Sequence, residues 1–225
     1  MIRCVVFDFD GVLVDSNAAK RQAYTDIFSG FGPPGATAVE AVLRADTEDD
    51  RFGVIRAILS ALPNPPNREE LDRRVAEHAE RYNLICEEFT ATCPEIPGAT
   101  AALERLARSH SLYVISATPQ EPLRRVVARR GWSAHFRGVL GRPAGKPENL
   151  ARVMRGEGID GGKIVFVGDG RRDLEAAQAA GCLFVGVRNR FNDFDSADLT
   201  MIDDLRSLPE LIERPVPARS ASQAG

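Results

Sequence analysis

The chain has 225 residues, of which 44% are hydrophobic and 27% are charged, and its formal net charge is −3. This length allows one large domain, or one domain with a smaller insert, and the composition is that of a globular protein. The small negative charge creates no field that favours nucleic acid, and no apolar run reaches the roughly 20 residues that a membrane-spanning helix needs. We therefore expect that the protein binds neither nucleic acid nor a membrane. Because the amino terminus lacks a signal-peptide pattern, we also expect a cytoplasmic location.

A short apolar run at residues 2–7 opens the chain and is typical of a strand that is buried on both faces, as in a parallel sheet. Similar runs follow at 112–116, 139–140, 164–168 and 183–187, with helical patterns between them. This alternation of strand and helix predicts an α/β fold with a doubly wound, Rossmann-like parallel sheet.

Residues 16–92 interrupt the alternation, because they contain helical patterns and no strand-like run. We expect an all-helical cap domain at 16–92, inserted into a catalytic core that comprises 1–15 and 93–213. The insert follows the carboxyl end of the first strand, where open α/β sheets bind ligands, so it is expected to act as a lid. The tail at 214–225 is rich in Pro, Ser and Ala and is expected to be disordered.

The longest predicted helix of the insert follows Asn67, a good N-cap residue. Its apolar stripe consists of Leu71, Val75, Ala79, Tyr82, Ile85 and Phe89.

Two acidic residues, Asp8 and Asp10, follow the first strand in the segment DFDG. Alternation along an extended chain places both side chains on one side, where two carboxylates repel each other unless a cation lies between them. Oxygen ligands beside a phosphate suit Mg²⁺. The alternative is a pair of exposed aspartates that cap the turn before Gly11.

A second acidic pair, Asp169 and Asp173, lies in the segment GDGRRD after the strand at 164–168. A spacing of four residues puts both on one face at a helix start, which favours negative charge. The alternative is that Asp169 caps the helix and Asp173 is a solvated acid.

Polar groups also follow the strand at 112–116. Ser116 lies at its carboxyl end, and its hydroxyl together with the backbone N–H of Ala117 can hold a phosphate oxygen. The next residues, Thr118, Pro119 and Glu121, match a capping box, which predicts that Thr118 starts a helix.

Lys146 precedes Pro147 and therefore lies at a predicted helix start, where the helix dipole disfavours a cation. It is one of three lysines in the chain, with Lys20 and Lys163. Lys146 needs a negatively charged partner, unless it is an ordinary surface lysine.

These acids, the serine and Lys146 all follow parallel strands, whose carboxyl ends converge on one crevice. That set suits phosphoryl transfer through an aspartyl-phosphate, with Mg²⁺ and a lysine to offset the phosphate charge. The segments DFDGVLVDS, SAT, GKP and GDGRRD, in this order, resemble the haloacid dehalogenase superfamily of phosphohydrolases. The resemblance covers residues 2–211 and is greatest to the phosphoglycolate phosphatase-like branch with a helical cap.

The resemblance implies a role for each motif residue. Asp8 would be the nucleophile and Asp10 the acid/base, while Ser116 and Lys146 would be catalytic groups that bind the phosphoryl group, with Ala117. The implied metal is Mg²⁺, and its predicted ligands are Asp8, Asp10 (through its backbone carbonyl), Asp169 and Asp173.

The chain departs from the family pattern at Gly170, where relatives often carry Ser, Thr or Ala. The adjacent pair Arg171–Arg172 is also unusual, and either contacts a substrate anion or lies in solvent.

We therefore expect a Mg²⁺-dependent phosphatase that acts on a small phosphorylated metabolite, an acid or a sugar. Lys20, Arg44 and Arg51 of the insert are candidate substrate contacts; otherwise they are surface charges of amphipathic helices. A sugar-phosphate mutase of the β-phosphoglucomutase type and a non-catalytic phosphate-binding protein are alternatives with the same core groups. The sequence leaves open whether the protein is a monomer or a homodimer.

Overall fold

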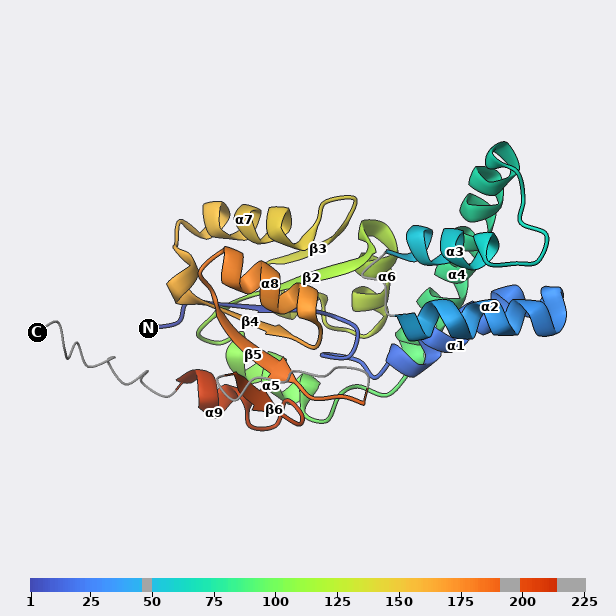
Figure 1. The fold of residues 1–225 in the computed structure, drawn as a ribbon. Helices are drawn as coiled ribbons and strands as arrows, with labels where there is room; N and C mark the ends of the chain where they lie inside the picture. Colours follow the sequence, from blue (N-terminus) through green and yellow to red (C-terminus); the bar gives the residue numbers. More distant parts are fainter. Residues whose placement is uncertain (46–49, 191–198, 214–225) are drawn as a thin grey trace, which may run out of the picture.

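The computed structural model describes residues 1–45, 50–190 and 199–213, and its centre is a six-stranded parallel sheet (Figure 1). The strand order is β3-β2-β1-β4-β5-β6. The strands are β1 (Cys4–Phe7), β2 (Ser111–Pro119), β3 (Gly138–Arg142), β4 (Ile164–Gly168), β5 (Leu183–Val187) and β6 (Thr200–Ile202). The predicted doubly wound α/β fold is confirmed, and β6 is a strand that the sequence did not predict.

Helices cover both faces of the sheet and one of its ends (Figure 1). The helices are α1 (Asn17–Phe28), α2 (Gly32–Ala45), α3 (Arg51–Ser60), α4 (Arg68–Thr92), α5 (Ala99–Leu106), α6 (Gln120–Arg129), α7 (Lys146–Glu157), α8 (Arg171–Ala179) and α9 (Leu208–Glu213), with short 3₁₀ turns at Ser29–Phe31, Ser133–His135 and Gly161–Lys163. Within the described ranges, no helix is both long and apolar enough to span a membrane.

The strand β1 shows why the sheet needs two helical layers. Its side chains alternate: Val5 and Phe7 pack with α5, α6 and α9, whereas Cys4 and Val6 pack with α7 and α8. All four residues have no exposed surface. Because both faces are buried, the strand reads as a continuous apolar run, as parallel strands do.

Helices α1–α4 lie beyond the carboxyl ends of the strands, at the right of Figure 1, and have a hydrophobic core of their own. Tyr24 and Tyr82 stack there with ring centroids 4.4 Å apart, and Ile55, Ile58 and Leu59 are fully buried. The all-helical cap inserted after the first strand is therefore confirmed. The exact domain boundaries stay a prediction, and the predicted disorder of 214–225 falls outside the described residues.

The helix α4 begins as predicted, because Asn67 is its N-cap and the Asn67 Oδ1 accepts a hydrogen bond from the backbone N–H of Glu70 at 3.0 Å. Its predicted apolar stripe is only partly right. Ile85 and Phe89 are 37% and 38% exposed, whereas Cys86 and Thr90 are buried in their place. In the last turns of the helix, the buried face is therefore shifted by about one residue from the predicted stripe.

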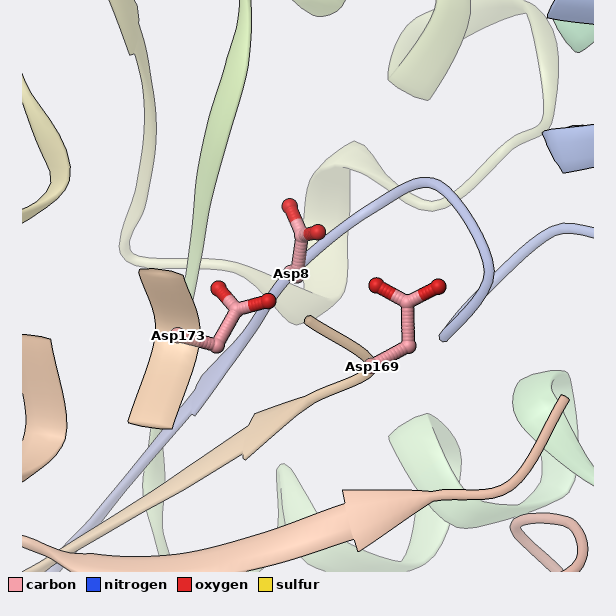
Figure 2. A group of neighbouring side chains, drawn as sticks. All are labelled: Asp8, Asp169 and Asp173. Carbon is pink, nitrogen blue, oxygen red and sulfur yellow. The ribbon is translucent and has the colours of Figure 1, made fainter. Parts of the chain in front are cut away.

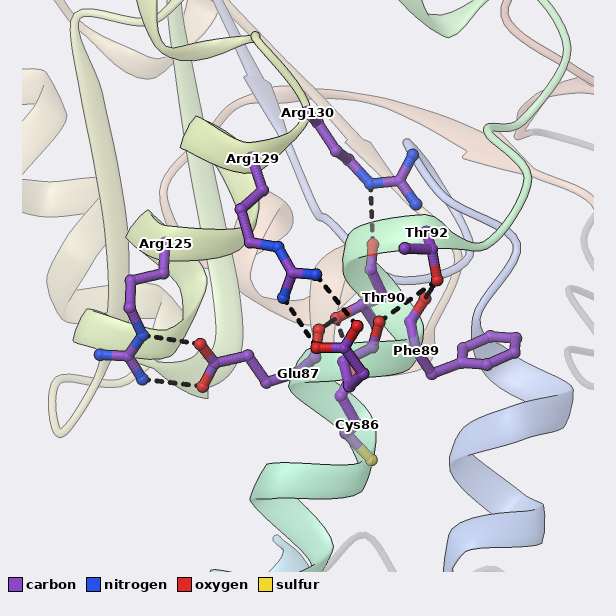
Figure 3. A network of polar contacts seen from close by, with 9 residues as sticks. Cys86, Glu87, Phe89, Thr90, Thr92, Arg125, Arg129 and Arg130 are labelled. Atoms are coloured by element: carbon purple, nitrogen blue, oxygen red, sulfur yellow. Dashed lines mark hydrogen bonds and ion pairs between the residues drawn. The ribbon is translucent and has the colours of Figure 1, made fainter.

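The end of α4 is bound to α6 by paired charges, which join the inserted helices to the core (Figure 3). Arg125 donates two hydrogen bonds to the Glu87 carboxylate at 2.6 and 2.7 Å, and Arg129 donates two to Glu88 at 3.0 Å. Arg130 donates to the backbone oxygen of Thr90 at 2.7 Å. These contacts fix where the inserted helices meet the sheet.

Candidate active site

Asp8 follows β1 directly and continues its alternation, so its side chain points to the face that carries α7 and α8. Its Oδ2 lies 3.1 Å from the Nζ of Lys146, the first residue of α7. The other oxygen, Oδ1, is buried and has no hydrogen-bond partner among the described residues. A buried, unpaired carboxylate oxygen is costly, so this oxygen is suited to bind a ligand.

Two further carboxylates lie beside Asp8 (Figure 2). Asp169 follows β4 and Asp173 lies in the first turn of α8, and one oxygen of each lies within 4.8 Å of an oxygen of Asp8. Asp173 is only 1% exposed, so the alternative of a solvated acid is wrong. Asp169 does not cap α8, because the N-cap position is Gly170.

The crowding of these acids changes their protonation. Burial raises the pKa of Asp8 well above its ordinary value; Lys146 acts in the opposite direction, while Asp173 and Asp169 raise the pKa further. Burial, and then the charge of Asp173, raise the pKa of Asp169 to about 6. Both shifts mean that burial and the neighbouring carboxylates disfavour the ionised forms of Asp8 and Asp169.

Lys146 is the cation in the middle of this group. Its Nζ lies 2.5 Å from the Asp173 Oδ1, in addition to its contact with Asp8. Burial alone would lower the pKa of Lys146, but the charges of Asp173 and Asp8 outweigh it and raise the pKa above the ordinary value. Lys146 therefore has the negative partners that the sequence required and is not a surface lysine.

The residues fit a divalent cation such as Mg²⁺. Asp8, Asp169 and Asp173 offer only oxygen ligands, within 4.8 Å of one another, and the Asp8 Oδ1 has no partner among the described residues. Lys146 contributes one positive charge beside these three carboxyl groups.

Asp10 has a different environment, although only one residue separates it from Asp8. Its carboxylate accepts hydrogen bonds from the Ser16 hydroxyl at 2.6 Å and the Thr118 hydroxyl at 3.2 Å, and it forms an ion pair with Lys20. Burial alone would raise the pKa of Asp10, but Lys20 and these hydrogen bonds lower it below the ordinary value. The Asp10 side chain is thus outside the acidic group; the predicted metal contact through its backbone carbonyl stays a prediction.

The predicted capping box at Thr118 is wrong. The strand β2 continues to Pro119, and α6 begins at Gln120 without a side-chain cap. The Thr118 hydroxyl donates to Asp10 instead, and Lys20 donates to that hydroxyl at 3.3 Å.

Ser116 lies at the carboxyl half of β2 and is buried, and its Oγ accepts a hydrogen bond from the backbone N–H of Thr118 at 3.1 Å. Ala117 is exposed and lies between them. The predicted contact of Ser116 and Ala117 with a phosphoryl group stays a prediction.

Two asparagines that the sequence did not single out hold Asp169 in place. Asn17, the first residue of α1, and Asn189, which follows β5, each donate a side-chain hydrogen bond to the Asp169 Oδ2 at 2.7 Å. Asn17 is 152 residues away from Asp169 in the chain, so local patterns could not reveal the contact. Asn189 does follow a strand, as the other site residues do.

Gly11 allows the turn after β1 to approach the side chain of Asp169 closely. Its φ is +76°, and a Cβ at this position would lie 1.9 Å from the Asp169 Oδ2. Any other residue would strain the turn and collide with Asp169.

A cavity of about 170 Å³ lies between the inserted helices and the end of β2. Lys20 and Arg51 line it, and so do Ala117, Thr118 and Arg172. The predicted contact of Lys20 and Arg51 with substrate stays a prediction. Arg44 is not brought to it: it lies in the last turn of α2, exposed, and pairs with Glu40 one turn earlier.

Comparison with known proteins agrees with this architecture. Residues 2–181 match the family model of the haloacid dehalogenase-like hydrolases. The chain is also 30% identical to a phosphoglycolate phosphatase of Neisseria meningitidis, over 99% of this chain and 97% of the relative. The chain therefore belongs to the haloacid dehalogenase-like hydrolases, and it is an enzyme of this class.

Solved structures have the same fold. A predicted phosphoglycolate phosphatase from Haemophilus somnus superposes with a TM-score of 0.77 at 20% identity, covering 93% of this chain and 97% of the other. A hydrolase of this family from Bacillus subtilis, solved with magnesium bound, superposes with a TM-score of 0.70 at 19% identity, covering 95% and 99%. At these identities the likeness concerns the fold alone.

Proposed function

We propose that this protein is a Mg²⁺-dependent phosphatase that hydrolyses a small phosphate monoester through an aspartyl-phosphate on Asp8. The observation that carries the proposal is the state of Asp8: it is buried, one oxygen faces Lys146, and the other has no partner among the described residues. The proposal assigns residues 1–15 and 93–213 to the catalytic core and 16–92 to the cap.

In the first step, a carboxylate oxygen of Asp8 attacks the phosphorus, and the bond from phosphorus to the leaving oxygen breaks. Asp10, protonated for this step, donates its proton to the leaving oxygen. In the second step, Asp10 takes a proton from water, the water oxygen attacks the phosphorus, and the bond to Asp8 breaks. Inorganic phosphate is released and both aspartates return to their starting states.

The other residues of the site position the reacting groups. Lys20, Ser16 and Thr118 contact the Asp10 carboxylate and stabilise the ionised form, which the first step produces and which accepts a proton from water in the second step. Lys146 orients Asp8 and offsets negative charge on the phosphoryl oxygens. The Ser116 hydroxyl and the Ala117 backbone N–H bind the phosphoryl group.

Asp8, Asp169 and Asp173, with the Asp10 carbonyl, would hold Mg²⁺. When bound, the ion offsets the negative charge of the carboxylates and of the incoming phosphate. Asn17 and Asn189 keep Asp169 oriented toward that position.

Relatives guide the choice of substrate. The relatives from Neisseria meningitidis and Pseudomonas aeruginosa are phosphoglycolate phosphatases, 30% and 29% identical to this chain. 2-Phosphoglycolate, a small phosphorylated acid, is therefore the first substrate to test. The mutase alternative needs the same core groups and differs in transferring the phosphoryl group to a sugar. The cytoplasmic location stays a prediction.

The test is release of inorganic phosphate from a panel of small phosphate monoesters, with Mg²⁺ or with a chelator. We expect Mg²⁺-dependent release by the wild type and a loss of at least about a thousandfold in Asp8→Asn, because the nucleophile is removed. Asp160→Asn is the matched control, since the Asp160 side chain is 70% exposed and forms a surface ion pair with Lys163.

Release that persists in Asp8→Asn, or that ignores the chelator, would contradict the proposal. No release from any ester by a folded wild type, together with conversion of a sugar monophosphate primed by a bisphosphate, would establish the mutase instead.

A further inference from the structure

We infer that Arg172 and Arg51 form a subsite for an anionic leaving group, so that the enzyme selects phosphate monoesters that carry a second negative charge, such as a carboxylate. The inference rests on the proposed phosphatase function and concerns the part of the substrate that leaves. Arg172 belongs to α8 of the core and Arg51 to α3 of the inserted helices, and both line the same cavity.

The cavity is small and joins the catalytic groups. Its volume, about 170 Å³, is below the roughly 300–1,000 Å³ of pockets for drug-sized ligands, so it suits a leaving group of a few atoms. It reaches the site at Ala117 and Thr118, and at Lys20, the partner of Asp10. The stacked rings of Tyr24 and Tyr82 form part of its wall.

Two acids line this cavity, Glu87 and Asp50, and each has a positively charged partner that does not line it. Glu87 accepts two hydrogen bonds from Arg125. Asp50 accepts from the backbone N–H groups of Phe52 and Gly53 and lies 3.5 Å from Arg142. Neither Arg125 nor Arg142 lines the cavity. Of the cations that line it, Lys20 pairs with Asp10.

Arg51 keeps unused hydrogen-bonding capacity. Its Nε is buried and has no hydrogen-bond partner within the described part of the chain. The guanidinium carbon of Arg51 lies 5.2 Å from the centroid of the Phe52 ring. A buried guanidinium donor without an acceptor is costly, and a ligand carboxylate supplies two acceptor oxygens in a geometry that matches the guanidinium.

Arg172 is the second arginine that lines the cavity. It is partly buried and forms no ion pair with any residue in the described ranges. The adjacent Arg171 is exposed and does not line the cavity. Of the unusual arginine pair, only Arg172 therefore borders the place where a leaving group lies.

The unpartnered Nε of Arg51 among the described residues, together with Arg172, makes this cavity suitable for an anion. A neutral alcohol as leaving group would leave both charges unpaired, which disfavours substrates such as simple alkyl phosphates. A carboxylate on the leaving group would bridge the core helix α8 and the inserted helix α3.

The experiment compares two substrates of equal size, 2-phosphoglycolate and its neutral amide, with simple alkyl phosphates as a third class. We measure kcat/KM for the wild type and for Arg172→Gln, Arg172→Lys, Arg51→Gln and the control Arg171→Gln. Circular dichroism and thermal unfolding establish that each variant is folded.

We expect the wild type to prefer the carboxylate over the amide by at least about tenfold, as for one charge-assisted hydrogen bond. Arg172→Gln and Arg51→Gln should each lose about tenfold or more on the carboxylate and less than about threefold on the amide. Arg172→Lys should recover part of the loss, and Arg171→Gln should equal the wild type.

Equal rates of the wild type on carboxylate and amide, or equal losses of Arg172→Gln on both, would overturn the anionic subsite and leave the phosphatase proposal intact. Phosphate release from the alkyl phosphates and from neither 2-phosphoglycolate nor its amide would also overturn the anionic subsite and leave the phosphatase proposal intact. Release from none of the esters by a folded wild type would instead contradict the proposed function itself.

Discussion

At the scale of single residues, Asp8 and Asp10 show how one side-chain type acquires two roles. Crowding by Asp173 and Asp169, added to burial, raises the pKa of Asp8, whereas Lys20, Ser16 and Thr118 lower the pKa of Asp10. The distinction lies in their partners, since only one residue separates the two in the chain.

Lys146 is predicted to be essential for the stability of this site. Lys146→Met would leave Asp8 and Asp173 buried together without their cation. The free energy of unfolding should fall by about 3–5 kcal/mol in the presence of a chelator, the cost of removing one partner of a buried ion pair. Urea titration followed by circular dichroism measures this change.

The control is Lys163→Met. Lys163 has a side chain that is 47% exposed and lies 3.5 Å from Asp160, so its loss should change the free energy of unfolding by less than about 0.5 kcal/mol. Equal unfolding midpoints for the two variants would contradict the central position of Lys146.

At the scale of elements, the strands of the core could largely be predicted from the sequence, because buried parallel strands are continuous apolar runs. The first strand illustrates this, since every residue from Cys4 to Phe7 is buried. The short strand β6 was not predicted, because Thr200–Ile202 has no such run. The start of α4 was predictable because Asn67 caps it through a local hydrogen bond.

Contacts between distant residues explain what the sequence could not predict. Thr118 matches a helix cap locally, yet its hydroxyl bonds to Asp10, 108 residues away. Asn17 likewise belongs to the site only because the fold brings α1 to the end of β4. The residues Asp8, Asp169, Asp173 and Lys146 were predictable because each follows a strand or starts a helix at the same edge of the sheet.

The Asn67 cap gives a prediction for α4. Asn67→Ala removes the acceptor of the Glu70 N–H and should lower the free energy of unfolding by about 1 kcal/mol. Asn67→Ser should keep most of the stability, because a serine hydroxyl can accept the same bond. Urea titration of both variants tests this, and equal losses would show that the cap does not stabilise the helix.

At the scale of the whole molecule, the inserted helices are joined to the core through α4 and α6 (Figure 3). Glu87 lines the cavity, and the hydrogen bond from Arg125 holds the pKa of Glu87 below its ordinary value. The interface therefore also controls the charge of the cavity. A substitution of Arg125 on α6 should therefore change substrate binding, because Arg125 is the partner of Glu87.

Arg125→Gln is predicted to raise KM for 2-phosphoglycolate about two- to fivefold, the range expected for one exposed charge pair. The reason is that an unpaired Glu87 repels the anionic leaving group. KM for the neutral amide should not change, and the double variant Glu87→Gln/Arg125→Gln should return to the wild-type value. Steady-state kinetics on both substrates measures these effects.

Arg129→Gln is the matched control, because its partner Glu88 does not line the cavity. If Arg129→Gln raised KM as much as Arg125→Gln, the effect would come from loosening the interface and not from the charge of Glu87.

The central claim is that Asp8 becomes phosphorylated, and mass spectrometry of acid-quenched enzyme tests it most directly. Wild type mixed with Mg²⁺ and 2-phosphoglycolate should carry one added phosphoryl group, on the peptide that contains Asp8. Asp8→Asn should carry none. A phosphoryl group on another residue, or rapid turnover by wild type with no covalent species at any quench time, would contradict the account.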